Sequence, residues 1–483
     1  ERIRLREIIS GIADFALVRG EIMKRSKLIG TRDFYRHVLL VAVPIMIQNG
    51  ITNFVGMLDN IMVGQVGTDQ MSGVAIVNQL LFVYNLMIFG GLAGIGIFTA
   101  QFAGKGDEKG LRYTMRIKIV MASILTAGAL ALFLSGGSTL IGMWLKGEST
   151  AGSAAATLTA ADRYLKVMLI GLIPFAATQV LSGTLRETGE TIVPMKAGIA
   201  AVAFNLVGNY ILIYGKFGAP ALGATGAAVA TVISRFVELA YVGLWMRRHL
   251  EKNRYLEGVF CGFYVPGDLV RRVVIKAMPL LMNETLWSLG QTMMSQQYSL
   301  RGLDVVAAFN ISNTICNVFN IAFIAMGDSI SIILGQELGA GRLSEVKDDS
   351  YRLSAFSVFL CVISGAGLFL VAAFFPMIYN TTAEVRNVAA GLIRISAVCM
   401  PLYAYENAAY FTLRSGGKTW ITFFFDCGFV WAVSLPLAAV LIHFTGLTIL
   451  PLFFAVQVVE IVKCVIGFVL VRQGKWIHDL TKY

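Results

Sequence analysis

The chain has 483 residues, of which 56% are hydrophobic and only 14% are charged, and its mean hydropathy is +0.70. Because a soluble domain carries about 25% charged residues, this composition excludes an ordinary soluble protein, and most of the apolar surface must face lipid. The formal net charge of +11 does not indicate a nucleic-acid-binding protein, because the Lys and Arg residues gather on alternate loops, as in membrane proteins.

Runs of mainly apolar residues follow one another along the chain, each about the 20 residues that cross a bilayer. Taken in order they predict about twelve transmembrane helices, which begin near Val38, Met71, Ile117, Tyr164, Ile192, Leu222, Val273, Val305, Leu353, Ala389, Trp420 and Leu447. A basic amphipathic segment, residues 1–31, precedes them and is either an interfacial helix or foreign to the natural chain. The pattern predicts an all-α integral membrane protein.

The loops between these runs alternate in charge. Basic residues gather within 105–118, 186–196, 247–276, 342–352, 414–418 and 472–475, whereas the opposite loops hold few, namely Lys146, Lys216, Arg301 and Arg386. By the positive-inside rule we predict that both termini are cytoplasmic, in a multi-pass protein of the plasma membrane. All six cysteines follow residue 260, and five lie inside apolar runs, so no disulfide framework is expected.

The sequence repeats itself after 235 residues. This shift aligns, without a gap, Pro44 with Pro279, Gly67 with Gly302, Asp69 with Asp304, Asn78 with Asn313, Asn85 with Asn320, Gln101 with Gln336, Gly104 with Gly339 and Gly106 with Gly341. Residues 185–191 and 413–419 then share the pattern L-R-x-x-G-x-T. So many polar, Pro and Gly matches in an apolar chain indicate an internal duplication.

The duplication predicts two lobes, residues 32–246 and 270–476, joined by a cytoplasmic linker, 247–269, and followed by a tail, 477–483. About six spans separate equivalent positions, and an even number preserves orientation. The lobes are therefore expected to be parallel-repeat six-helix bundles, related by an axis along the membrane normal. Two such lobes can rock about a central cavity, which favours a transporter with alternating access over a pore.

These residues resemble the multidrug and toxic compound extrusion (MATE) antiporters over residues 32 to about 476. The matching pieces are the Pro44 helix leading into L-D-N-I-M-V-G at 58–64, both L-R-x-x-G-x-T loops, Asn205 and Asn209, and G-A-T-G-A-A-V-A-T at 223–231. The resemblance implies export of organic cations or drugs in exchange for sodium ions or protons, with no cofactor besides the coupling ion.

Four acids lie inside predicted spans: Asp59, Glu284, Glu406 and Asp426. A charged carboxylate at the centre of a span costs roughly 2.5 to 3.5 kcal/mol, so intramembrane acids are functional candidates. In the repeat, position 59 corresponds to Met294, 284 to Asn49 and 426 to Gly198. The scaffold is duplicated but these acids are not, as expected of a substrate or ion site that has diverged.

A first site is predicted in the amino-terminal lobe. Asn205 and Asn209 lie four residues apart, on one helix face, and with Asp59 and Thr231 they offer hard oxygen ligands that suit Na⁺. In the family this cluster is a proposed ion or proton site, and some members have Asp where this chain has Asn209. The alternative is that both Asn merely join helices while Asp59 reaches the membrane interface.

A second site, for substrate or a second ion, is predicted in the carboxyl-terminal lobe from Glu284, Asp426 and Glu406. Glu284 matches the span-seven acid of one branch of the family, whereas Tyr403 stands where that branch has a span-ten acid. Glu406 and Asp426 are candidates for that acid's role, unless Tyr403 and Tyr405 anchor Glu406 at an interface. Glu238 and Glu460, which occupy equivalent places in the two repeats, are interpreted as structural. The pairs Asn78 with Asn313 and Asn85 with Asn320 are interpreted as links between helices, with the alternative that some of them line the cavity.

Other functions are disfavoured. His37, His249, His443 and His478 are too scattered for a zinc enzyme, and the chain has no G-x-S-x-G elbow and no nucleotide-binding phosphate loop. No filter-like segment indicates a channel. The nearest rival is a flippase for lipid-linked saccharides, but its cavity would be strongly basic, whereas the central spans here hold more acid than base. We expect a monomer that contacts small organic cations and membrane lipid, and no nucleic acid.

Overall fold

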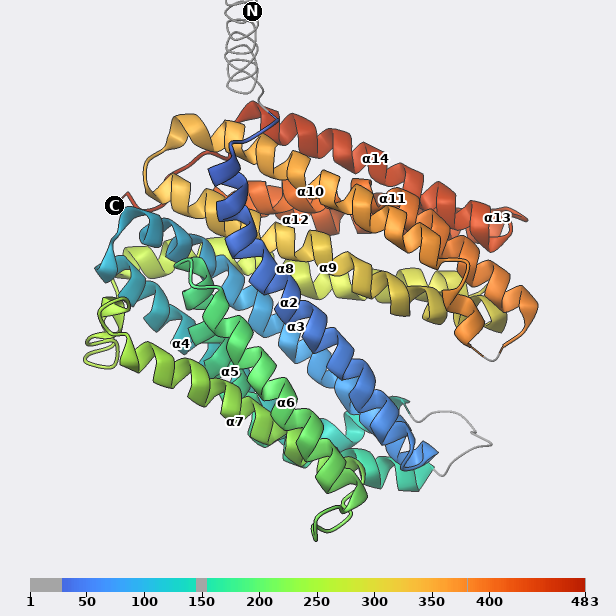
Figure 1. Ribbon diagram of the computed structural model, residues 1–483. Coiled ribbons are helices and arrows are strands. Elements are labelled where there is room, and N and C mark those ends of the chain that lie inside the picture. The colour runs from blue at the N-terminus through green and yellow to red at the C-terminus, as the bar shows by residue number, and fades with distance from the viewer. Residues whose placement is uncertain (1–27, 145–153, 380, 483) are drawn as a thin grey trace, which may run out of the picture.

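The computed structural model describes residues 28–144, 154–379 and 381–482, which are almost entirely helical (Figure 1). Of the predicted amphipathic segment 1–31, all but the last four residues lie outside this description. Within the described residues twelve helical segments are long enough to cross a bilayer: α2 (Arg32–Gly64), α3 (Thr68–Lys105), α4 (Glu108–Trp144), α5 (Ala154–Glu187), α6 (Ile192–Tyr214), α7 (Ala224–Arg248), α8 (Gly267–Ser299), α9 (Leu303–Gly339), α10 (Leu343–Val371), α11 (Ala383–Ser415), the run from α12 (Thr419–Phe423) to α13 (Leu435–Phe444), and α14 (Ile449–Gln473).

Eleven of these segments are also apolar enough to span a membrane. The exception is α8, which carries Arg271, Arg272 and Lys276 in its first half and amides and hydroxyls in its second. Several helices begin well before the predicted spans: α4 starts at Glu108, nine residues ahead of Ile117. The first turns of α4 hold basic residues, so a prediction from hydropathy alone leaves these turns out of the span.

The helices form two bundles, α2–α7 and α8–α14 (Figure 1). The prediction of an all-α membrane protein with two six-helix bundles is therefore confirmed, while the exact lobe boundaries stay a prediction. The repeat is visible in helix length, because α2 and α8 have 33 residues each and α7 and α14 have 25 each. The first helix of each bundle straddles the interface, since α2 packs on α9 and α8 packs on α3.

The bundles are closely packed at the end where the described chain finishes and diverge toward the other end (Figure 1). At the packed end a Cβ atom on Gly104 would overlap the carbonyl of Gln336, and one on Gly339 would overlap that of Gln101. The four residues are two repeat-equivalent pairs. Only glycine lets the backbones of α3 and α9 approach this closely, so this interlobe contact is built symmetrically from the duplicated sequence.

The basic cluster at 105–118 is not simply a solvated loop. Arg116 is 6% exposed, and its guanidinium donates to the carbonyls of Gly258, Val259, Cys261 and Tyr264 at 2.5 to 3.0 Å. Lys118 is 1% exposed and is ion-paired with Glu187. These two side chains extend from α4 to fix the linker and the first L-R-x-x-G-x-T loop.

The eleventh span contains two π-helical turns, Phe424–Gly428 (η3) and Val430–Ser434 (η4), between α12 and α13. Its counterpart α6 is a regular α-helix. A π turn widens the helix and is frequent at functional sites. Asp426 lies in the first of these turns.

Candidate functional site

A cavity of about 1070 Å³ lies between the two bundles. Its lining comes from both bundles; among the described spans α4 and α10 do not contribute, and the eleventh span contributes only through its π turns. The lining includes seven acids and three bases: Asp59, Glu238, Glu284, Asp328, Glu406, Asp426 and Glu460 against Arg186, Arg235 and Lys463. If all are ionised, the wall carries more negative than positive charge, which suits a cationic ligand.

The cavity stops short of the packed end. From α3 it is lined by Asn85 and Phe89, and from α9 by residues between Phe309 and Asp328. Beyond these positions, toward Lys105 and Gly339, the two helices pack directly against the opposite bundle. Along α8, in contrast, the lining extends from Glu284 to Tyr298 at the diverging end.

The four residues predicted in the amino-terminal lobe do come together. Asn209 Nδ2 on α6 donates to Asp59 Oδ1 on α2 at 2.5 Å, and Asn205 Nδ2 lies 3.1 Å from Thr231 Oγ1 on α7. Turning the Asn205 amide over lets its nitrogen donate to both Asp59 oxygens, at 3.0 and 3.2 Å, and its oxygen accept from Thr231 at 3.1 Å. The hydrogen-bond network favours this second orientation, in which Asp59 is held by two amides.

The cluster also has a spare ligand atom. Asn209 is completely buried, and its Oδ1 is without a hydrogen-bond partner among the described residues. A buried unpaired oxygen is costly, so it marks a place where a cation or a water would be stabilised. With the carboxylate of Asp59 and the hydroxyl of Thr231 it adds a third hard oxygen to the cluster.

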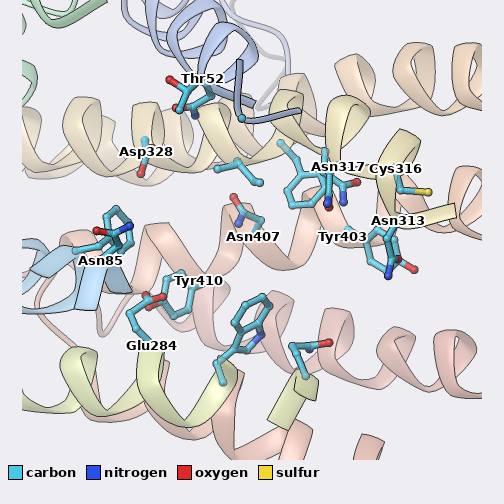
Figure 2. Close-up of a pocket in the computed structure, with 18 of the residues that line it drawn as sticks. Thr52, Asn85, Glu284, Asn313, Cys316, Asn317, Asp328, Tyr403, Asn407 and Tyr410 are labelled. Carbon is cyan, nitrogen blue, oxygen red and sulfur yellow. The ribbon is translucent and has the colours of Figure 1, made fainter. Parts of the chain in front are cut away.

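Glu284 lies on α8 beside Tyr410 of α11, and Asn85 of α3 lies near the pair (Figure 2). Its side chain packs over Gly90 of α3, where a Cβ would come within 3.0 Å of Glu284 Cγ. This acid therefore sits where the two bundles meet.

Asp426 lines the same cavity and is linked to α8 through the neighbour of Glu284. Asn283 Nδ2 donates to Asp426 Oδ2 at 3.0 Å and lies 3.3 Å from Tyr410 Oη. The Asn283 Oδ1 atom accepts from the backbone amide of Cys427, at 3.3 Å, within the π turn. Hydrogen bonds thus join Asp426 to Asn283 and Tyr410, the two residues beside Glu284.

Asp426 is not a free carboxylate, which the sequence did not predict. Lys463 Nζ on α14 donates to Asp426 Oδ1 at 3.0 Å and lies 3.6 Å from Glu406 and 4.0 Å from Glu460. Tyr403, one of the two tyrosines considered as an interface anchor for Glu406, instead donates its hydroxyl to Gln457 at 2.5 Å, and both residues line the cavity. Glu406 itself is 8% exposed.

Several lining residues were not among the predicted site residues. Asp328 on α9 points into the cavity (Figure 2), and since its repeat partner is Ala93, the criterion that selected the other acids would have found it. Glu238 and Glu460, interpreted as structural, both line the cavity. So do Asn85, Asn313 and Asn320, whereas Asn78 accepts a hydrogen bond from Tyr164 at 3.3 Å.

Sequence comparison decides the family. The MatE family profile matches the chain twice, at residues 44–211 and 279–440, once in each bundle. The chain belongs to the MATE family. The probable multidrug resistance protein NorM of Thermotoga maritima is 25% identical over 450 residues, which cover 91% of this chain and 93% of that protein.

Solved MATE structures share the fold. An outward-facing multidrug resistance MATE family transporter matches with a TM-score of 0.79 at 17% identity, over 90% of this chain and 94% of that one. A mutant of the Vibrio cholerae MATE transporter VcmN matches with a TM-score of 0.82 at 16% identity, over 92% and 98%. This MATE protein is therefore a multi-pass membrane transporter of the multidrug efflux family, not an enzyme.

Proposed function

We propose that this MATE protein exports organic cations or drugs in exchange for Na⁺ or H⁺, by alternating access of its two lobes. The observation that carries the proposal is the acidic cavity between the bundles, with seven lining acids against three bases. An anionic cargo such as a lipid-linked saccharide phosphate would need a cavity with more basic than acidic lining residues. A cation entering this cavity exchanges water for fixed carboxylates.

Asp59, Asn205, Asn209 and Thr231 are proposed as the coupling site. Protonation of Asp59 removes the charge that attracts Na⁺, so a proton and a sodium ion compete for the same carboxylate. The unpaired oxygen of Asn209 and the hydroxyl of Thr231 complete the oxygen ligands. Asp59 lines the cavity directly, so a bound ion can influence the cargo electrostatically.

Glu284, Asp426 and Glu406 are proposed as the substrate or second ion site. They face the same cavity from α8, the π turn and α11. The packed end holds the basic clusters, so we assign it to the cytoplasm by the positive-inside rule. In this orientation the cavity opens outward, both termini are cytoplasmic, and the conformation is the one that releases cargo outside a plasma membrane. We propose that the monomer is the working unit.

Transport by the variant Asp59→Asn tests the coupling site. In proteoliposomes loaded with ethidium, we expect the parent to export dye when a Na⁺ or a pH gradient is applied, each gradient being imposed separately to identify the ion. Asp59→Asn should abolish gradient-driven export, because the amide can neither bind a proton nor attract Na⁺. Undiminished ion-driven export by this variant would refute the assignment.

Asp69→Asn is the matched control. Asp69 is a repeat-conserved acid at the start of α3, outside the cavity lining, where it accepts a hydrogen bond from Thr157 at 3.2 Å. This variant should retain gradient-driven export. Equal loss in both variants would mean that any acid change near this end of the bundle disables the protein.

A further inference from the structure

Three carboxylates of the carboxyl-terminal bundle converge on one ammonium group. Lys463 Nζ lies 3.0 Å from Asp426, 3.6 Å from Glu406 and 4.0 Å from Glu460, and the lysine side chain is only 8% exposed. The ring of Phe425 is centred 5.6 Å from the same nitrogen. Carboxylates together with an aromatic face are the groups with which proteins bind ammonium ions.

Each carboxylate is oriented by a further donor. The donors are Asn283 Nδ2 to Asp426 at 3.0 Å, Ser434 Oγ to Glu460 at 2.8 Å and Cys464 Sγ to Glu406 at 3.7 Å. Glu460 Oε2 is buried and is without a hydrogen-bond partner among the described residues. The cluster is therefore a formed cation site with acceptor capacity to spare, and its occupant is tethered to α14.

The duplicated scaffold does not require this lysine. Counted from their first residues, Arg235 and Glu238 are the twelfth and fifteenth residues of α7, as Glu460 and Lys463 are of α14. This register corrects the pairing of Glu238 with Glu460 expected from the sequence, because it places Glu460 opposite Arg235 and Lys463 opposite Glu238. The i,i+3 ion pair is thus present in both bundles with its charges exchanged, at 3.8 Å in α7 and 4.0 Å in α14. Packing alone would be served by either order of the acid and the base along the helix. The exchange of the two charges in α14 does, however, move the positive charge by one helical turn within the cavity.

We propose that Lys463 is a specificity-determining residue: a tethered counter-ion that sets how much positive charge the carboxyl-terminal half of the cavity accepts. The proposal rests on the proposed function and extends it by naming the feature that sets the preferred charge of the cargo. With Lys463 in place, the ionised cluster of Asp426, Glu406 and Glu460 has a formal charge of −2 instead of −3. The resident ammonium repels each positive charge of a cargo, so it lowers the preference for organic dications over monocations relative to the three carboxylates alone.

A charge series tests the proposal on purified protein. Tetraphenylphosphonium serves as the monocation and pentamidine, a bis-amidinium, as the dication, and isothermal titration gives both dissociation constants. Lys463→Gln changes the formal charge of the cluster to −3, Asp426→Asn changes it to −1, and the double variant restores −2. We expect the preference for pentamidine to rise about tenfold in Lys463→Gln, equivalent to about 1.4 kcal/mol, to fall in Asp426→Asn, and to return to the parent value in the double variant.

Two further variants separate charge from packing. Lys463→Arg keeps the charge and should keep the parent's preference. Lys118→Gln breaks another buried lysine–glutamate pair, with Glu187, outside the cavity lining, and should lower thermal stability without altering the preference. If Lys463→Gln does not fold, Asp426→Asn is compared with the double variant. A return of the pentamidine preference to the parent value in the double variant supports the proposal, and an equal preference in these two variants overturns it.

The failures are distinguishable. If the parent binds neither probe, the proposed function fails, and the role of Lys463 fails with it. If the parent binds tetraphenylphosphonium and the preference is the same in the parent, Lys463→Gln and Asp426→Asn, the proposed function stands and Lys463 is only a structural partner of Asp426.

Discussion

Glu284 and Asp426, two of the three acids proposed to hold cargo, differ in the charged groups that lie against them. Lys463 neutralises Asp426, whereas among the ion pairs of the described residues none includes Glu284. Glu284 lies at the meeting point of α8, α3 and α11, with Gly90 and Tyr410 against it. Of the three acids proposed for the substrate site, Glu284 is therefore the one without an ion-pair partner among the described residues.

Glu284→Gln should weaken binding of tetraphenylphosphonium about tenfold, or by about 1.4 kcal/mol, because an amide offers no net charge to a cation in a low-dielectric cavity. Equilibrium dialysis with the purified protein measures it. Glu345→Gln, at an exposed acid in the first turn of α10, is the control and should bind as the parent does. Parental affinity in Glu284→Gln would place the cargo site elsewhere, with Asp59 the next candidate.

At this scale the sequence predicted which acids line the cavity better than it predicted their ion-pair and hydrogen-bond partners. An acid within an apolar run is recognisable because its burial is costly, and the repeat showed that Asp59, Glu284 and Asp426 have no acidic counterparts. The approach of Lys463 to Asp426 joins α14 to the π turn across 37 positions. No local pattern encodes that distance, since it depends on how α11, α12 and α14 pack.

Among the helices, number and order were predictable but ends and irregularities were not. Hydropathy finds the part of a helix that lies in lipid, so the charged first turns of α4 and the polar α8 were underestimated. The π turns around Asp426 were not foreseen, because Phe424–Ser434 has the same apolar composition as a regular span. Asn283 of α8 donates a hydrogen bond to Asp426 in the first π turn. A polar contact between helices therefore accompanies the change from α-helical to π-helical winding.

The close crossing of α3 and α9 yields a prediction about glycine. Gly339→Ala should destabilise the protein by about 1 to 3 kcal/mol, the usual cost of overpacking, because the new methyl overlaps the Gln101 carbonyl. Thermal unfolding in detergent, followed by tryptophan fluorescence, measures the change in midpoint. Gly128→Ala in α4, where a Cβ meets no atom within 4 Å, should be neutral or slightly stabilising. The prediction fails if the two variants unfold alike.

Across the whole molecule, the packed end is held by two glutamines that are equivalent in the repeat. Gln336 Nε2 of α9 donates to the carbonyl of Glu187, in the first L-R-x-x-G-x-T loop, at 2.8 Å. Gln101 Nε2 of α3 donates to the carbonyl of Ser415, in the second loop, at 3.0 Å. The second helix of each bundle, α3 or α9, therefore binds the L-R-x-x-G-x-T loop of the other bundle.

Residues 474–482 add an asymmetric part to this contact. Gln101 Oε1 accepts from the amide of Leu480 at 2.7 Å, and Lys105 Nζ reaches the carbonyl of Thr481 at 3.4 Å. Trp476 and Thr481 are buried at 1% and 0% exposure. For the packed end to open, as alternating access requires, both glutamine bonds and this covering segment must separate.

Removing both glutamine side chains should therefore shift the protein toward a state open at the packed end. Each buried amide bond contributes about 0.5 to 1.5 kcal/mol, so losing both in Gln101→Ala with Gln336→Ala should change the ratio of the two states by about fivefold to 150-fold. Spin labels at Glu108 and Ser344, both exposed beside the packed end, report the separation by double electron–electron resonance. We expect a longer distance to gain population in the double variant. Gln65→Ala, which loses only a 2.9 Å bond to Tyr214 within one bundle, should keep the parent's distribution. Identical distributions in all three proteins would show that the glutamines do not hold the lobes together.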